Sequence, residues 1–65
     1  MCQLTVKITR HGHEEVLARD VASVESRDDA VVLLPLFDEP ITVAHAAIQR
    51  IDSMNAVVTL AETAP

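Results

Sequence analysis

The sequence predicts a single small domain built mostly from β-strands. Hydrophobic residues make up 49% of the chain, whereas aromatic residues make up only 2%. Nine valines and four isoleucines supply much of the apolar surface, and such side chains favour pleated, half-buried strands. Because a chain of 65 residues buries only a thin core, we expect one domain over residues 1–65.

The first predicted strand covers residues 2–9, in which apolar and polar residues alternate strictly. Side chains two positions apart share one face of a strand, so the alternation predicts one buried and one exposed face. The apolar face carries Cys2, Leu4, Val6 and Ile8. His11, Gly12 and His13 follow, and the only glycine of the chain suits a hairpin turn that needs a positive φ.

Short polar segments divide the middle of the chain, the first of them Arg19 and Asp20. We expect strands over residues 14–18 and 21–25, followed by a polar turn over 26–29 in which one of the two aspartates takes the left-handed conformation. Residues 30–34 are apolar on both faces, which indicates a central or interface strand.

Residues 35–40, with the sequence PLFDEP, form a predicted corner bracketed by prolines. This corner contains the only aromatic residue, Phe37, which we expect to plug an open end of the core. A short strand is predicted at 41–43. Residues 42–54 stay open between two interpretations, because apolar side chains recur there at helical spacing and a hairpin with Asn55 in its turn fits as well.

The composition excludes several classes of function. Ten acidic residues against five Lys and Arg leave a net charge of −5 with no basic run, so nucleic-acid binding is not expected. One glycine excludes a phosphate-cradling loop, and one cysteine excludes an internal disulfide and the usual four-ligand zinc site. A domain this small, with no evident oxyanion donors, is not expected to be an enzyme.

The beginning of the chain predicts a cellular location. Met1–Arg10 alternates polar and apolar residues, so we expect neither a secretion signal nor a membrane span. A single reduced thiol then indicates the cytoplasm.

Cys2 is a candidate metal ligand because backbone geometry sets its donor atoms at chelating distance. If Met1 is retained, its amine, the backbone nitrogen of Cys2 and the Cys2 thiolate form two fused chelate rings around one ion. If Met1 is removed, the amine and the thiolate of Cys2 still form one such ring. Nitrogen and sulfur donors in a plane suit Ni(II) or Cu(II), and thiolates also suit zinc. One chain fills only two or three coordination positions of such an ion, so we expect a two-fold dimer that presents two Cys2 thiolates to it. The alternative is that Cys2 is a small buried hydrophobe.

The histidines are weaker candidates. His11 and His13 flank Gly12, and on an extended strand they would point to the same side as a possible secondary metal pair. The alternative is a solvated polar turn. His45 stands alone between alanines, and we expect a structural or surface role for it.

Three segments together resemble a known family. The start MCxxxV, the segment LFDEP at Leu36–Pro40 and the stretch IQRIDSMNAVVTL at Ile48–Leu60 are similar to CooT-type nickel-binding proteins, some of which carry the name predicted RNA-binding protein. The similarity in order and spacing extends over nearly the whole chain. One departure is His45, where relatives tend to have glycine.

The resemblance implies a compact all-β, barrel-like domain of about six short strands, which favours strands over 42–54. It also implies a homodimer that binds nickel through Cys2, with the terminal amine or backbone nitrogens as companions, and an association with the maturation of carbon monoxide dehydrogenase. The family gives no support for metal at His11 and His13.

The leading hypothesis is a cytoplasmic, metallochaperone-like homodimer that holds Ni(II) between two Cys2 residues and passes it to a client enzyme. A second hypothesis is a small β-barrel module that binds RNA or a protein partner, with Cys2 structural. A third is a dimer that the metal only stabilises.

Overall fold

The computed structural model describes residues 3–64 and folds them into one six-stranded sheet. The strands are β1 (Leu4–Arg10), β2 (His13–Arg27), β3 (Ala30–Pro35), β4 (Ile41–Ala44), β5 (Ala46–Asp52) and β6 (Val57–Glu62). Their order in the sheet is β4-β3-β2-β1-β6-β5, and all neighbours are antiparallel except β1 and β6. The expected all-β fold of six strands is confirmed.

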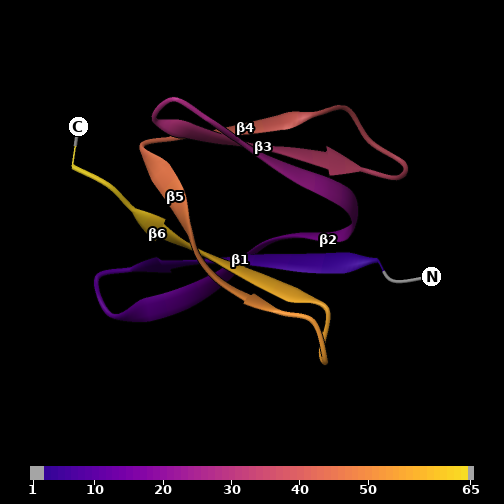
Figure 1. Ribbon diagram of the computed structural model, residues 1–65, viewed down its shortest axis with the longest axis horizontal. Helices are drawn as coiled ribbons and strands as arrows, with labels where there is room; N and C mark the ends of the chain where they lie inside the picture. Colours follow the sequence, from indigo (N-terminus) through magenta and orange to yellow (C-terminus); the bar gives the residue numbers. More distant parts are fainter. Residues whose placement is uncertain (1–2, 65) are drawn as a thin grey trace.

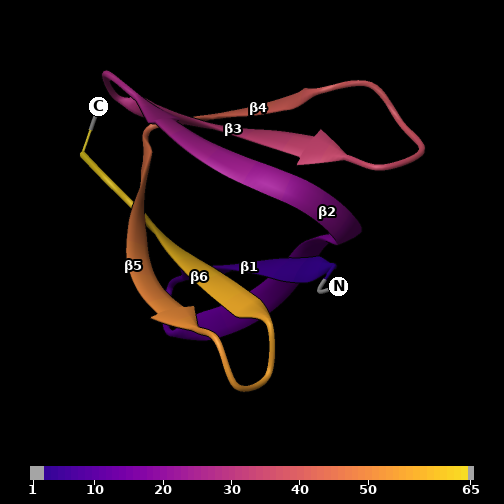
Figure 2. The ribbon, with the colours of Figure 1, turned by 45° about the vertical axis from the view of Figure 1, so that its right-hand side comes forward.

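The sheet curls into two layers that face each other across the core (Figures 1 and 2). Nine buried hydrophobic residues line the inner face: Val6, Ile8, Val21, Val31, Leu33, Val43, Ala46, Val58 and Leu60. The alternation predicted for the first strand is confirmed, because Val6 and Ile8 are buried while Lys7 between them faces outward.

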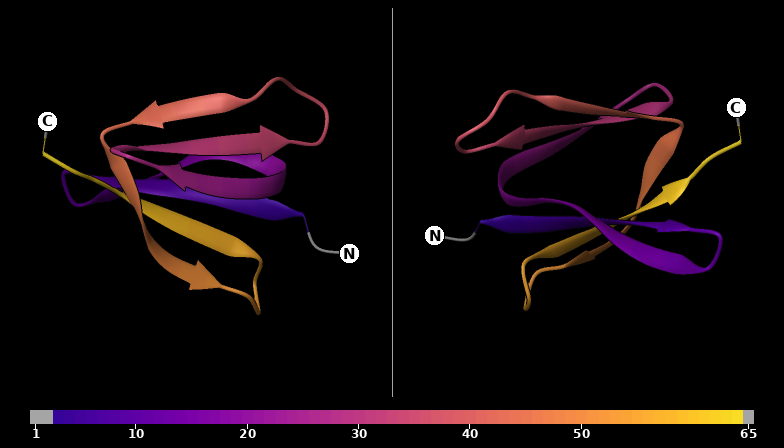
Figure 3. Two further views of the ribbon diagram at one scale, coloured as in Figure 1. Left: turned by 45° about the horizontal axis from the view of Figure 1, so that its top comes forward. Right: turned by 180° about the vertical axis from the view of Figure 1, so that it is seen from behind.

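β2 is one continuous strand of 15 residues, so the prediction of two strands over 14–18 and 21–25 was wrong. The polar step between them is a bend, in which Asp20 has a φ of 55° and the register shifts after Val21. Such an irregularity bends a strand and increases its twist without ending it. β2 therefore pairs with β1 in one layer and with β3 in the other (Figure 3).

Two tight turns follow the sequence closely. His11 and Gly12 have φ values of 52° and 77°, and two successive positive values are typical of the type I′ hairpin turn. Asp28, with a φ of 48°, is the aspartate that takes the left-handed conformation after β2.

The stretch 42–54 forms strands, which agrees with the resemblance rather than with its helical spacing. Ala46–Asp52 pairs along β6, where Ile48 lies opposite Leu60. Long-range pairing and burial outweigh a weak local helix propensity here.

The sheet is not closed into a barrel, which corrects the expected barrel-like shape. β4 and β5 are joined through His45, whose φ is 54°, yet they are the two edges of the sheet and do not pair with each other. They diverge from this corner (Figure 2). Ile41 lies opposite buried Leu33, so it faces the inside, but it is 38% exposed.

The corner at 35–40 points outward. The backbone N–H of Leu36 donates to the carbonyl of Asp20 at 2.9 Å, which holds the corner beside the bend of β2. Phe37 then projects away from the molecule and is 82% exposed, so the prediction that it plugs the core was wrong. No helix that could cross a membrane occurs among residues 3–64.

Candidate functional site

Met1 and Cys2, the expected nickel ligands, lie outside the described residues. β1 begins at Leu4, two positions after Cys2, so the surroundings of that strand start are informative. Leu4 lies opposite Val21 of β2, and Val21 lies opposite Pro35 at the end of β3. On the other side of β1, the N–H of Thr5 donates to the carbonyl of Ala56 at 2.9 Å.

The start of β1 therefore lies between the β3–β4 loop and the β5–β6 turn, as all views show (Figures 1–3). Apolar side chains gather at this end of the described chain. Five of its six exposed large hydrophobic residues belong to these two connections or to the strand ends beside them: Leu36, Phe37, Ile41, Ile51 and Met54. We call these five residues the apolar end.

The openness of the sheet explains part of this exposure. Ile51 lies opposite buried Val58 on the inner face, yet it is 67% exposed because β4 does not cover β5. Phe37 and Met54 are 82% and 92% exposed at the tips of their connections. Exposed apolar side chains on the two connections that flank the start of β1 make this end a candidate interaction surface.

His11 and His13 lie at the opposite end of β1, in and just after its turn with β2. Both are exposed, and His11 has a positive φ, so the extended geometry expected for the pair is not present. Seven strand residues separate them from the start of β1, a span of about 20 Å. Within residues 3–64, no three His, Cys, Asp or Glu side chains gather as a metal site.

His45 has a structural partner that the sequence did not reveal. Its Nδ1 lies 2.7 Å from Oδ2 of Asp29, and the hydroxyl of Thr63 donates to Oδ1 of the same carboxylate at 2.7 Å. Backbone bonds add to this clasp: His45 N–H donates to the Asp29 carbonyl at 2.7 Å, and Thr63 N–H donates to the His45 carbonyl at 2.8 Å. The hydrogen bonds from Thr63 and then His45 lower the pKa of Asp29.

The clasp is not a nucleophilic triad. In a triad the hydroxyl bonds to the histidine, whereas here Thr63 and His45 both contact the Asp29 carboxylate and no proton relay connects them. Its effect is to tie the β2–β3 turn, the β4–β5 corner and the segment after β6 together.

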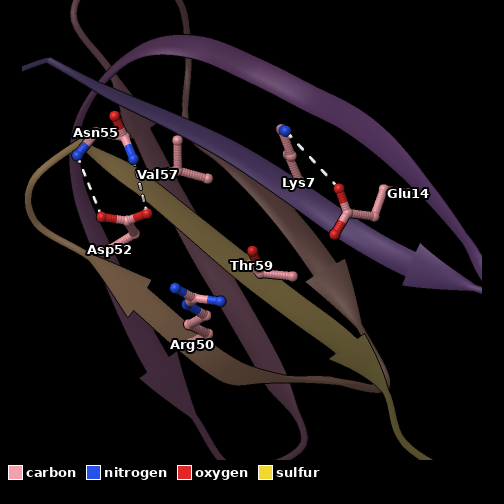
Figure 4. A pocket seen from close by; sticks show the side chains of 7 residues that line it. All are labelled: Lys7, Glu14, Arg50, Asp52, Asn55, Val57 and Thr59. Atoms are coloured by element: carbon pink, nitrogen blue, oxygen red, sulfur yellow. Dashed lines mark hydrogen bonds and ion pairs between the residues drawn. The ribbon is translucent and has the colours of Figure 1, made fainter.

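An open polar groove of about 310 Å³ lies on the outer face of β1, β6 and β5 (Figure 4). Lys7 and Glu14 line one end, Asp52 and Asn55 line the other, and Arg50 and Thr59 lie between them. Hydrogen bonds from the side chain and backbone of Asn55 lower the pKa of Asp52. No sequence pattern indicates this groove, because its residues come from four strands and a turn.

Residues 1–61 match the family model described as CO dehydrogenase accessory protein CooT. The chain belongs to the CooT family. This confirms the resemblance seen in the sequence, and it confirms that the chain is an accessory protein rather than an enzyme.

The fold of this CooT chain also matches a solved structure. A crystal structure assigned as CooT, from Carboxydothermus hydrogenoformans, superposes with a TM-score of 0.81 and covers 97% of this chain and 100% of its own. The two sequences are 19% identical, so the match concerns the fold alone. A comparison with curated proteins gives no match.

Proposed function

We propose that this CooT chain is a cytoplasmic nickel-binding accessory protein that works as a homodimer. Cys2 of each copy contributes a thiolate to one Ni(II) ion at the dimer interface, and the ion is then passed to a nickel enzyme such as carbon monoxide dehydrogenase. The family description supports the accessory role, because it names CO dehydrogenase.

The observation that carries the proposed dimer is the apolar end around the start of β1. Covering Phe37, Met54 and Ile51, which are 82%, 92% and 67% exposed, would remove much apolar surface from water. In a two-fold dimer the same patch meets itself, so residues inside the patch approach their own copies. Leu4 begins its strand between the two connections that carry the apolar end, so this pairing would bring the two Cys2 residues together.

The chemistry of the proposed donors fits transfer better than permanent storage. A thiolate with a nearby amine or backbone nitrogen suits Ni(II), and ligands near a chain start leave the ion accessible for exchange. The thiol must lose its proton to bind, from an unperturbed pKa of about 8.5, so affinity should fall as the pH falls.

Nickel titration of the wild type and Cys2→Ser tests the metal site. We expect one Ni(II) per two wild-type chains with a sulfur-to-nickel absorption band, and neither binding nor band for Cys2→Ser. Circular dichroism checks that the variant is folded. Equal nickel binding by both proteins would overturn the proposed site and favour a module in which Cys2 is structural.

Phe37→Ser tests the interface separately from the ligand. Because Phe37 is 82% exposed, its replacement should leave the fold intact. Loss of an aromatic residue from an interface typically costs about 2 kcal/mol, and a two-fold dimer loses the ring from both copies, so we expect a cost of about 4 kcal/mol and dimerisation weakened about 1000-fold by analytical ultracentrifugation. Val16→Thr is the matched control, because Val16 is 42% exposed but lies away from the apolar end. If both variants dimerise like the wild type, the apolar end is not the interface.

A further inference from the structure

The outer groove contains a row of two cations with a hydroxyl between them. Thr59 on β6 lies opposite Lys7 on β1 and opposite Arg50 on β5, and all three side chains line the groove. Neighbouring strands are about 4.8 Å apart, so the Cα atoms of Lys7 and Arg50 lie about 10 Å apart across the threonine. Both side chains are long enough to reach a group that rests above Thr59, although the Lys7 ammonium is turned toward Glu14 in the structure (Figure 4).

The donors of this row are available. Within the described part of the chain, Arg50 takes part in no ion pair and the Thr59 hydroxyl in no hydrogen bond. After the hydrogen bonds from Asn55, the charge of Arg50 also helps to lower the pKa of Asp52, but only from a longer distance. Lys7 forms an ion pair with the Glu14 carboxylate at 3.8 Å, which is too long for a hydrogen bond, so the ammonium of Lys7 keeps its N–H groups for another acceptor. The Asp52 carboxylate already accepts two bonds from Asn55, at 3.0 and 3.2 Å.

We propose that the Lys7–Thr59–Arg50 row docks a single carboxylate side chain of a partner polypeptide. The guanidinium of Arg50 offers two parallel N–H groups that match a carboxylate, and the Thr59 hydroxyl and Lys7 ammonium add donors on either side. The groove is not an enclosed cavity, whereas sites for small molecules bury most of their ligand. A side chain presented by a polypeptide fits this shape.

The ends of the groove determine what can surround that carboxylate. Glu14 and Asp52 lie on opposite sides of the row and would repel a second acidic group (Figure 4). The preferred segment therefore carries an isolated Glu or Asp between neutral or basic residues. Polyacidic segments and RNA are disfavoured because their negative charges are closely spaced. The net charge of −5 also repels any polyanion.

The test uses metal-free protein, because no residue of the row belongs to the proposed nickel site. The peptide acetyl-Gly-Ser-Glu-Ser-Gly-amide is titrated while amide NMR spectra are recorded, with the Gln peptide as reference. We expect saturable shifts at Lys7, Arg50 and Thr59 with the Glu peptide only. Absence of those shifts, or equal shifts with the Gln peptide, would overturn the proposal.

Two variants should move affinity in opposite directions. Arg50→Gln removes the bidentate donor and should weaken peptide binding about fivefold. Glu14→Gln releases Lys7 and removes a repelling carboxylate, so it should tighten binding about threefold. If the peptide responded only to the total charge of the protein, the affinity would not depend on which of its charged residues is replaced.

Matched controls separate the row from total charge. Arg19→Gln removes an exposed cation outside the groove, and Glu25→Gln releases Arg27 from a 3.2 Å ion pair elsewhere. We expect neither to change the affinity. Equal effects of the control and groove variants would overturn the proposal, as would inorganic phosphate or a single-stranded RNA that shifts the same amides as strongly at matched ionic strength.

Discussion

Ala56→Gly should stabilise the protein, because Ala56 has a left-handed backbone conformation that is strained for alanine and unstrained for glycine. Ala56 ends the β5–β6 turn with a φ of 55°. The left-handed region costs a residue with a Cβ about 1–2 kcal/mol. Glycine gives back about 0.4–1 kcal/mol through the greater freedom of its unfolded chain. The balance is a gain of about 0.5–1 kcal/mol in the free energy of unfolding.

Urea and thermal unfolding of the two proteins measure this gain. A domain of this size gains about 4–8 °C in Tm for each kcal/mol, so we expect a rise of about 4 °C. The carbonyl that accepts from Thr5 is a backbone group and survives the substitution. Both proteins are compared metal-free at one concentration, because binding and association would shift Tm on their own. An unchanged or lower Tm would refute the reasoning.

His45→Gly provides the comparison that isolates the clasp. His45 has a φ of 54°, nearly that of Ala56, so glycine relieves the same backbone cost. His45→Gly also removes the 2.7 Å contact between the His45 side chain and Asp29, whereas Ala56 makes no such side-chain contact. We therefore expect a smaller gain than for Ala56→Gly. An equal or larger gain would mean that the side-chain contact between His45 and Asp29 contributes nothing to stability.

Two further predictions concern the core and pH. Leu33 is fully buried, so Leu33→Ala should lower the free energy of unfolding by about 2–5 kcal/mol. A chain of this length has a total of about 3–10 kcal/mol, so the urea midpoint should fall to a small fraction of the wild-type value. The pKa of Asp29 is lowered in the folded state from 3.8, so its stabilising contribution is present above that value and is lost as the pH falls through the folded pKa. Asp29→Asn should flatten the dependence of the urea midpoint on pH below about pH 4, and an unchanged pH dependence would contradict this role.

Much of the local structure could be predicted because it depends on neighbours in the sequence. Alternation with a period of two correctly placed Val6 and Ile8 inside and Lys7 outside. The positive φ of Gly12 and of Asp28 follows from residue types that tolerate it. The strand at Ala46–Asp52 was different, because local spacing equally favoured a helix and only the family resemblance indicated a strand.

The candidate sites were predictable only in part. Cys2 stood out through donor chemistry and the resemblance, but its role stays a prediction because it lies outside the described residues. The prediction of a metal pair at His11 and His13 depends on an extended strand geometry that the turn at His11 does not have. The Lys7–Thr59–Arg50 row had no sequence signal, since its members are far apart along the chain and meet only through strand register.

The β class, the inward and outward faces of the first strand and the tightest turns follow from the amino-acid sequence alone, because they depend on side-chain period and backbone preference. The three-dimensional fold is needed to see that β2 bends without breaking, that the edges β4 and β5 stay apart, and that Phe37 faces outward. These outcomes depend on how distant strands pair and how a thin core is shared between two layers, and no local pattern encodes that balance.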